Sequence, residues 1–129
     1  MTRLLLDTHA FLWWTSSPER LSAVARDAIA SASNEVLVSH VSAWEMAIKA
    51  GLAKLRLPAP VARFFPDQLA RNGFAALPLE LRDLTAVEAL PQHHRDPFDR
   101  LLVAQALRGR LTLVTADPVI ERYGVRVLA

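Results

Sequence analysis

Short runs of apolar residues recur along the chain, each bounded by polar residues, glycine or proline. Five of them are typical of strands: residues 3–7 (RLLLD), 34–40 (NEVLVSH), 74–79 (FAALPL), 111–117 (LTLVTAD) and 125–129 (VRVLA). The first run is apolar at consecutive positions, which indicates a strand buried on both faces, as in a parallel sheet. The pattern therefore predicts four to five strands, most of them parallel.

The segments between these runs carry helical signals. Five helices are predicted, over residues 17–32, 42–55, 58–73, 82–91 and 97–109. Ser17, followed by proline, fits an N-cap, and Ser42 with Glu45 fits a capping box. Pro66 interrupts the third segment, which is one broken helix or two short ones. Gly51 marks the end of the second helix or a break in it.

Strands that alternate with helices predict an α/β fold, with a largely parallel sheet covered by helices on both faces. In such sheets, ligands bind at the carboxyl ends of the strands. The residues that end the strands, or begin the helices after them, are therefore the candidates for function.

Length and composition restrict the class of protein. With 129 residues the chain is predicted to be one domain with a single core, spanning residues 1–129. It has no cysteine, which excludes disulfides and thiolate metal sites. No apolar run is long enough to span a membrane, and the apolar start carries Arg3 and Asp7, unlike a signal peptide. We expect a soluble cytoplasmic protein without a membrane partner.

The net charge is small unless some acids are neutralised. Fifteen basic and 13 acidic residues give +2 at pH 7, and Lys49 and Lys54 are the only lysines. If four acids held a metal, the remaining 15 basic and 9 acidic residues would leave +6. Such a surface would attract a polyanion.

Four acids lie where the predicted fold places functional residues. They are Asp7 at the end of the first strand, Glu45 early in the helix after the second, Asp99 in the first turn of the last long helix, and Asp117 at the end of the fourth strand. Crowded carboxylates repel one another, and Mg²⁺ or Mn²⁺ relieves the repulsion because these ions prefer oxygen ligands. Such a metal polarises phosphodiesters and activates water, which is nuclease chemistry.

Helix capping is a competing explanation for most of these acids. Asp96 and Asp117 both precede a proline and fit N-caps. Asp99 would then occupy the third helical position, where an acid favours the helix dipole. Asp7 caps no obvious helix, and an acid that leaves a buried strand without a visible partner is most often functional or paired.

Histidines and tryptophans are weaker candidates. His93 and His94 are adjacent, so only one of them could easily reach a metal, and a solvated loop is the competing interpretation. Trp13, Trp14 and Trp44 lie among apolar residues, which favours the core or a subunit interface over base stacking.

Four segments, each holding one of the acids, carry a resemblance: LLLDTHAFLWW, SAWEMAIKAGLAKLRLP, LPQHHRDPFDRLLVAQAL and LTLVTADPVIERYGVRVL. Together they resemble the PIN-domain ribonucleases, and specifically the VapC-type toxins of bacterial type II toxin–antitoxin systems, over residues 3 to 128. The resemblance implies a PIN-like α/β/α sandwich around a parallel sheet. It also implies endonucleolytic cleavage of RNA that leaves 5′-phosphate and 3′-hydroxyl ends.

The resemblance also implies residues for an acidic quartet that binds Mg²⁺ or Mn²⁺: Asp7, Glu45, Asp99 and Asp117. We expect the three aspartates to lie nearest the metal, with Glu45 completing the site or orienting the attacking water. Asp96 stays open as a cap, an outer acid or the ligand itself. Supporting candidates are Thr8, Thr115, Arg95 and Arg100. The two hydroxyls would orient water or a carboxylate, and the two arginines would meet phosphate.

The expected partners are a cognate VapB-like antitoxin, an RNA substrate and a second copy of the chain in a homodimer, with DNA bound only through the antitoxin. The main alternative is a catalytically silent or receiver-like Mg²⁺-binding module that acts through a protein partner. A receiver should carry a phosphoacceptor at the end of its middle strand, and FAALPL ends without an aspartate. The late lysine of a receiver is missing too, and fold analogy alone assigns no function.

Overall fold

The computed structural model describes residues 1–129 and contains one sheet of five parallel strands. They are β1 (Arg3–Leu6), β2 (Glu35–Ser39), β3 (Ala75–Leu77), β4 (Thr112–Val114) and β5 (Arg126–Leu128), in the order β3-β2-β1-β4-β5. The predicted α/β class and parallel sheet are confirmed. The order differs from the 2-1-3-4-5 order of flavodoxin-like folds, to which receivers belong, so the sheet gives no support to a receiver-like module.

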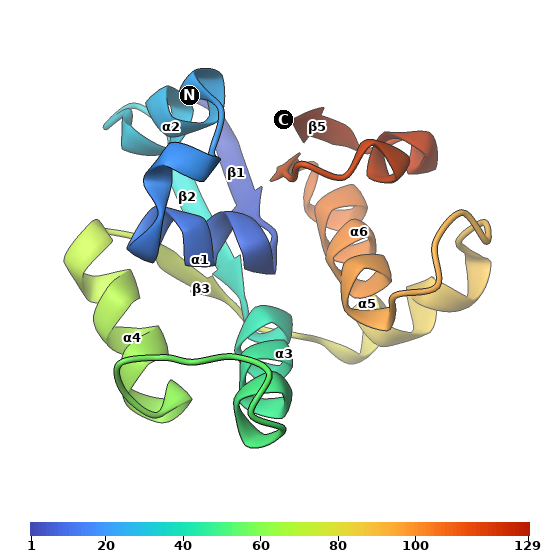
Figure 1. The fold of residues 1–129 in the computed structure, drawn as a ribbon. Coiled ribbons are helices and arrows are strands. Elements are labelled where there is room, and N and C mark those ends of the chain that lie inside the picture. The colour runs from blue at the N-terminus through green and yellow to red at the C-terminus, as the bar shows by residue number, and fades with distance from the viewer.

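Six α-helices and three short 3₁₀ helices join the strands (Figure 1). The α-helices are α1 (Thr8–Ser16), α2 (Ala23–Ala30), α3 (His40–Gly51), α4 (Val61–Asn72), α5 (Leu81–Ala86) and α6 (Pro97–Gly109). The 3₁₀ helices are η1 (Pro18–Arg20), η2 (Val87–Ala89) and η3 (Pro118–Tyr123). Helices α1, α2 and α4 pack on one face of the sheet, α6 packs on the other, and α5 packs against α6 (Figure 1). None of the helices has the length and apolar character needed to cross a membrane.

The core has one apolar layer on each face of the sheet. Along β1, Leu4 and Leu6 belong to one layer and Leu5 to the other, as the two-residue period of a strand requires. Phe11 of α1 and Leu102 of α6 are fully buried in the first and second layer respectively. Burial on both faces explains why the first strand is apolar at consecutive positions.

Helix α1 is not predicted by the sequence, and Asp7 is its N-cap. The Ala10 amide donates to Asp7 Oδ1 at 2.8 Å. The interpretation that Asp7 caps no helix is therefore wrong. The central AFLWW segment of α1 is apolar at five consecutive positions. It therefore lacks the alternation of apolar and polar positions about every 3.6 residues by which a helix is recognised in a sequence.

The helix predicted over residues 17–32 is two separate elements. Ser17 precedes η1 but forms no side-chain capping bond, and Ser22 is the cap of α2, accepting from the Ala25 amide at 3.0 Å. Between them Leu21 is extended (φ −83°, ψ 149°) and buried in the core. Burial of Leu21 requires the chain to turn there, which breaks the helix.

The N-cap of helix α3 lies three residues before the predicted cap Ser42. Ser39 is the N-cap, and its Oγ accepts from the Val41 amide at 3.0 Å. The predicted capping box of Ser42 and Glu45 is therefore wrong, because both residues lie within the helix and are buried. The helix ends at Gly51, one of the two predicted alternatives, and does not continue to residue 55.

The remaining predicted helices are present with small differences. Helix α4 continues through Pro66 to Asn72, and its C-cap Gly73 adopts the left-handed conformation (φ 69°) that favours glycine. The segment 82–91 contains most of α5 and then η2. Helix α6 begins after Asp96, whose Oδ1 accepts from the amides of Phe98 and Asp99 at 2.8 and 3.1 Å, so the predicted cap is confirmed.

Candidate active site

The four predicted acids come from elements that end or begin at the carboxyl edge of the sheet. Asp7 follows β1 at the centre of the sheet, and Asp117 closely follows the neighbouring β4. Glu45 lies on α3, which follows β2, and Asp99 lies in the first turn of α6. The parallel topology brings these segments to the same edge, as the sequence predicts.

Asp7 is buried, with 8% of its surface exposed. Burial raises the pKa of its carboxyl above the usual 3.8, although hydrogen bonds from Thr115 and from the Ala10 amide oppose the rise. Thr115 Oγ1 also accepts from the Asp117 amide at 3.1 Å. Thr115 therefore contacts both Asp7 and Asp117.

Glu45 is held by two polar side chains, Thr8 and Lys49. Thr8 Oγ1 donates to Glu45 Oε1 at 2.6 Å and lies 3.0 Å from Ser42 Oγ. Lys49 Nζ donates to Glu45 Oε2 at 2.5 Å. The hydrogen bond with Glu45 raises the pKa of Lys49. Both carboxylate oxygens of Glu45 are therefore fixed, and one positive charge lies next to it.

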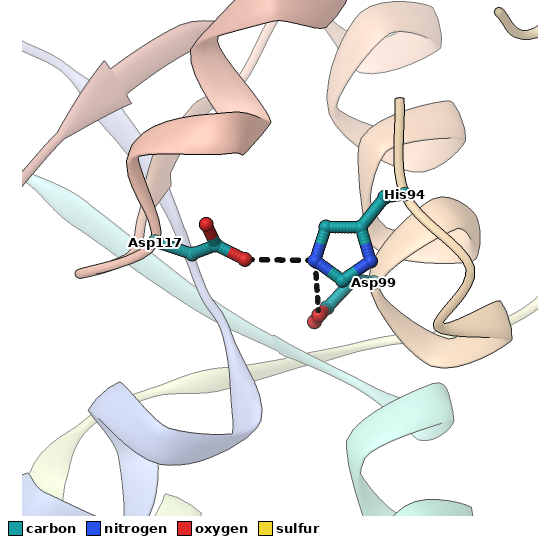
Figure 2. Close-up of side chains that lie close together, drawn as sticks. All are labelled: His94, Asp99 and Asp117. Atoms are coloured by element: carbon teal, nitrogen blue, oxygen red, sulfur yellow. Dashed lines mark hydrogen bonds and ion pairs between the residues drawn. The ribbon is translucent and has the colours of Figure 1, made fainter. Parts of the chain in front are cut away.

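His94 lies between the carboxylates of Asp99 and Asp117 (Figure 2). Its Nε2 is 2.7 Å from Asp117 Oδ2 and 3.5 Å from Asp99 Oδ2. One ligand-type atom from each of the three residues lies within 4.8 Å of the others. The Asp96 amide donates to His94 Nδ1 at 3.1 Å, so Nδ1 carries the lone pair and Nε2 carries the hydrogen that Asp117 accepts.

The two aspartates beside His94 have opposite pKa shifts. Burial, followed by the negative charges of Asp96, Asp7 and Glu45, raises the pKa of Asp99 from 3.8 to about 7. Burial also raises the pKa of Asp117, but hydrogen bonds from His94 and from a backbone amide outweigh this and leave the pKa below its usual value. The negative charge of the cluster is thus least compensated at Asp99.

The two predicted phosphate-binding arginines have different surroundings. Arg100 is buried and donates to the carbonyls of Pro91, Val87 and Leu90 at 2.8, 3.1 and 3.4 Å. Its Nη1 also donates to the Tyr123 hydroxyl at 3.3 Å, at the end of η3. The prediction that Arg100 meets phosphate is therefore wrong, because its donors are used inside the protein. Arg95 is exposed near the cluster.

The sequence could narrow the choice to one histidine of the adjacent pair but could not name it. His94 is the one that reaches the acids, whereas the His93 ring packs edge-on against Tyr123 with centroids 5.0 Å apart. Asp96 is turned towards the backbone amides of its own helix. Its amide is what orients His94, a contact that residue types alone do not reveal.

Comparison with known proteins places the chain in a family. Residues 4–125 match the family profile of the PIN domain. The chain is 36% identical over 117 residues to ribonuclease VapC22 of Mycobacterium tuberculosis, a match that covers 91% of this chain and 88% of that protein. A shorter match of 47 residues, 43% identical, links 36% of the chain to 33% of ribonuclease VapC16 of the same organism.

Solved structures show the same fold at low sequence identity. A chain of VapBC2 from Rickettsia felis, bound to a promoter DNA fragment, matches with a TM-score of 0.71 at 14% identity, covering 98% of each chain. DNA-bound VapBC from Salmonella typhimurium gives 0.69 at 16% identity, with 99% and 98% covered. FitAcB from Neisseria gonorrhoeae gives 0.67 at 18% identity, with 98% and 96% covered. The chain belongs to the PIN-domain family and, within it, to the VapC-type ribonucleases.

Proposed function

We propose that the chain is the toxin of a VapBC-type toxin–antitoxin pair and cleaves RNA with a divalent metal bound at the acidic cluster. The observation that carries this proposal is Asp99, whose pKa is raised to about 7 by burial and by three nearby carboxylates. The protein's own side chains do not remove this repulsion, since the cation Lys49 pairs with Glu45 and the neutral His94 donates its Nε2–H to Asp117. Relatives named as ribonucleases support RNA as the substrate.

The chemistry of the donors fits a hard divalent cation. Carboxylate oxygens are the ligands that Mg²⁺ and Mn²⁺ prefer, and the family of the chain is one of nucleases. We assign the metal to Asp7, Asp99 and Asp117, with Glu45 completing the site, and propose Mg²⁺, with Mn²⁺ able to replace it. A divalent cation supplies Lewis-acid chemistry at such a site: it polarises the phosphodiester and lowers the pKa of water.

The protein's own groups would fix the geometry of the reaction. Thr8 and Lys49 hold both oxygens of Glu45, so this carboxylate can orient an attacking water in line with the leaving oxygen. Thr115 orients Asp7 and Asp117, and His94 holds Asp117 through its Nε2–H. In this tautomer His94 is a positioning residue and not a metal ligand.

The Asp96 cap would serve the site indirectly. It fixes the first turn of α6, which carries Asp99, and its amide orients His94. Of the two arginines predicted to meet phosphate, Arg95 is exposed and remains able to do so. We assign to Asp96 a role in positioning the cluster rather than direct contact with the metal.

We also propose partners for the chain. Two solved structures with its fold are described as VapBC bound to DNA. A VapB-like antitoxin would bind this chain, and DNA would be contacted through the antitoxin. A homodimer and an RNA substrate complete the proposed set, with action in the cytoplasm.

The test is cleavage of a labelled total-RNA pool by antitoxin-free protein, with Mg²⁺, with Mn²⁺ and with chelator. The Asp7→Asn variant removes the charge but keeps an oxygen that can cap α1. Asp27→Asn, an exposed acid on α2, is the matched control. We expect metal-dependent cuts with 5′-phosphate ends that Asp7→Asn abolishes and Asp27→Asn retains. Cleavage that persists in chelator, or in Asp7→Asn, would contradict the proposal.

A further inference from the structure

A groove beside the acidic cluster carries the opposite charge. It has a volume of about 390 Å³ and lies between α1, η1 and the end of α3. Its lining includes Thr8, Trp13, Arg20, Lys49 and Lys54, and no acid. The two lysines are the only ones in the chain, so all of its lysine is in this one place.

Two of the three cationic side chains in the groove are not paired with a carboxylate. Lys49 pairs with Glu45, as described above. Neither Arg20 nor Lys54 lies within ion-pair distance of a carboxylate. Exposed cations that the protein leaves unpaired remain able to bind an external anion.

Local structure holds each unpaired cation at the groove. The guanidinium carbon of Arg20 lies 4.8 Å from the centroid of the Trp13 ring, so the indole face positions the charge and leaves N–H donors at its edge. After α3, the Lys54 amide donates to the Lys49 carbonyl at 2.8 Å and the Ala53 amide to the Ala50 carbonyl at 3.1 Å. This Schellman ending brings the Lys54 backbone back to Lys49.

The groove adjoins the acidic cluster through Thr8 and Lys49. Thr8 lines the groove and donates to Glu45 Oε1 at 2.6 Å. Lys49 also lines the groove, and after the larger effect of Glu45 the negative charges of Asp96 and Asp99 contribute to its raised pKa. A chain of phosphates bound along the groove would therefore lead directly to the acids.

We propose that this groove binds the phosphodiester backbone of a single-stranded segment of the RNA next to the cleaved bond. Arg20 and Lys54 each bind one phosphate, and Trp13 positions Arg20. The inference rests on the proposed ribonuclease function and adds where the substrate lies. The positive charge of the groove supports the proposal. The carboxylate cluster repels phosphates, so a surface that binds the RNA backbone beside it must supply cations.

The experiment measures binding of a labelled single-stranded RNA oligonucleotide by fluorescence anisotropy, in chelator and in the Asp7→Asn background, over a range of salt concentrations. Arg20→Met and Lys54→Met remove one charge each. Arg71→Met, on the exposed side of α4, is the control. Thermal unfolding of each variant confirms that it folds, and cleavage of the same RNA by the protein with Asp7 intact runs in parallel.

Each lost phosphate contact should reduce the slope of log affinity against log salt by about 0.7, which corresponds to about eightfold weaker binding at about 50 mM salt. We expect this for Arg20→Met and Lys54→Met, about 60-fold weakening for the double variant, and no change for Arg71→Met. A DNA oligonucleotide of the same sequence should lose affinity in the same variants, because phosphates are common to both.

Three results would overturn the proposal. The first is that the groove variants bind RNA with the same affinity and the same salt slope as the control. If the protein with Asp7 intact still cleaves the RNA, the groove assignment fails and the proposed function stands. Absence of both binding and cleavage would remove the proposed function as well. Tight binding of a polyglutamate peptide, abolished by the same substitutions, would assign the groove to an acidic protein partner instead.

Discussion

Replacing Asp99 by asparagine should stabilise the metal-free protein at neutral and alkaline pH. Burial and nearby carboxylates raise the pKa of Asp99 from 3.8 to about 7. Between these two pH values the folded chain holds a proton that the unfolded chain has lost, so the free energy of unfolding falls as the pH rises, and above about 7 the loss is complete. Asparagine has no charge to desolvate, so the variant avoids this loss.

The size of the effect follows from the pKa difference. One pKa unit corresponds to about 1.4 kcal/mol, so a change from 3.8 to about 7 gives at most about 4 kcal/mol. A quarter of the Asp99 side chain, 26%, remains exposed, and solvent there screens part of the repulsion. We therefore expect the variant to be about 2 kcal/mol more stable than the unsubstituted protein at about pH 8.

Urea unfolding in chelator, from pH 4 to 8, measures this difference. The advantage of Asp99→Asn should shrink towards pH 4, where the aspartate is protonated in the folded state. Adding Mg²⁺ should stabilise the unsubstituted protein and not the variant, because a ligand that binds only the folded state raises its stability. Asp27→Asn should show no pH-dependent difference. A variant that is less stable at pH 8, or an advantage that does not change with pH, would refute the reasoning.

Two further substitutions test the framework around the site. Arg100→Lys should lower the free energy of unfolding by about 2 to 3 kcal/mol, because lysine cannot satisfy three carbonyls and a hydroxyl together; a loss within the error of urea unfolding would contradict this. Ala53→Gly should raise the thermal midpoint and stabilise by about 0.5 to 1 kcal/mol, since Ala53 adopts a left-handed conformation (φ 58°) that glycine tolerates better. An unchanged or lower midpoint would count against the strain at this position.

The sheet and the convergence of acids could be predicted because they depend on residue type alone. Consecutive leucines in β1 indicate a strand buried on both faces, and parallel strands bring their carboxyl ends together. Proline after Asp96 and after Asp117 indicated two caps correctly. The apolar run and the Asp-Pro pairs act through neighbouring residues of the chain, so tertiary contacts do not change their effect.

The errors come from side chains whose partners are distant in sequence. Ser42 and Glu45 match a capping box by spacing, but their partner is Thr8, which lies on another helix. Arg100 stands beside acids in the sequence, yet it turns to the carbonyls of the preceding segment. The contact of His94 with Asp117 spans 23 residues and depends on the packing of η3 against α6.

The buried guanidinium of Arg100 links three separate parts of the chain. It binds carbonyls that precede His94, it is next to Asp99 in α6, and it contacts Tyr123 in η3, the 3₁₀ helix that Asp117 caps. The spacing of the three groups drawn in Figure 2 therefore depends on Arg100, whose guanidinium binds none of them. A change at this position would alter the affinity for metal and the rate of cleavage together, and kinetics alone would not distinguish it from the loss of a residue that touches the substrate.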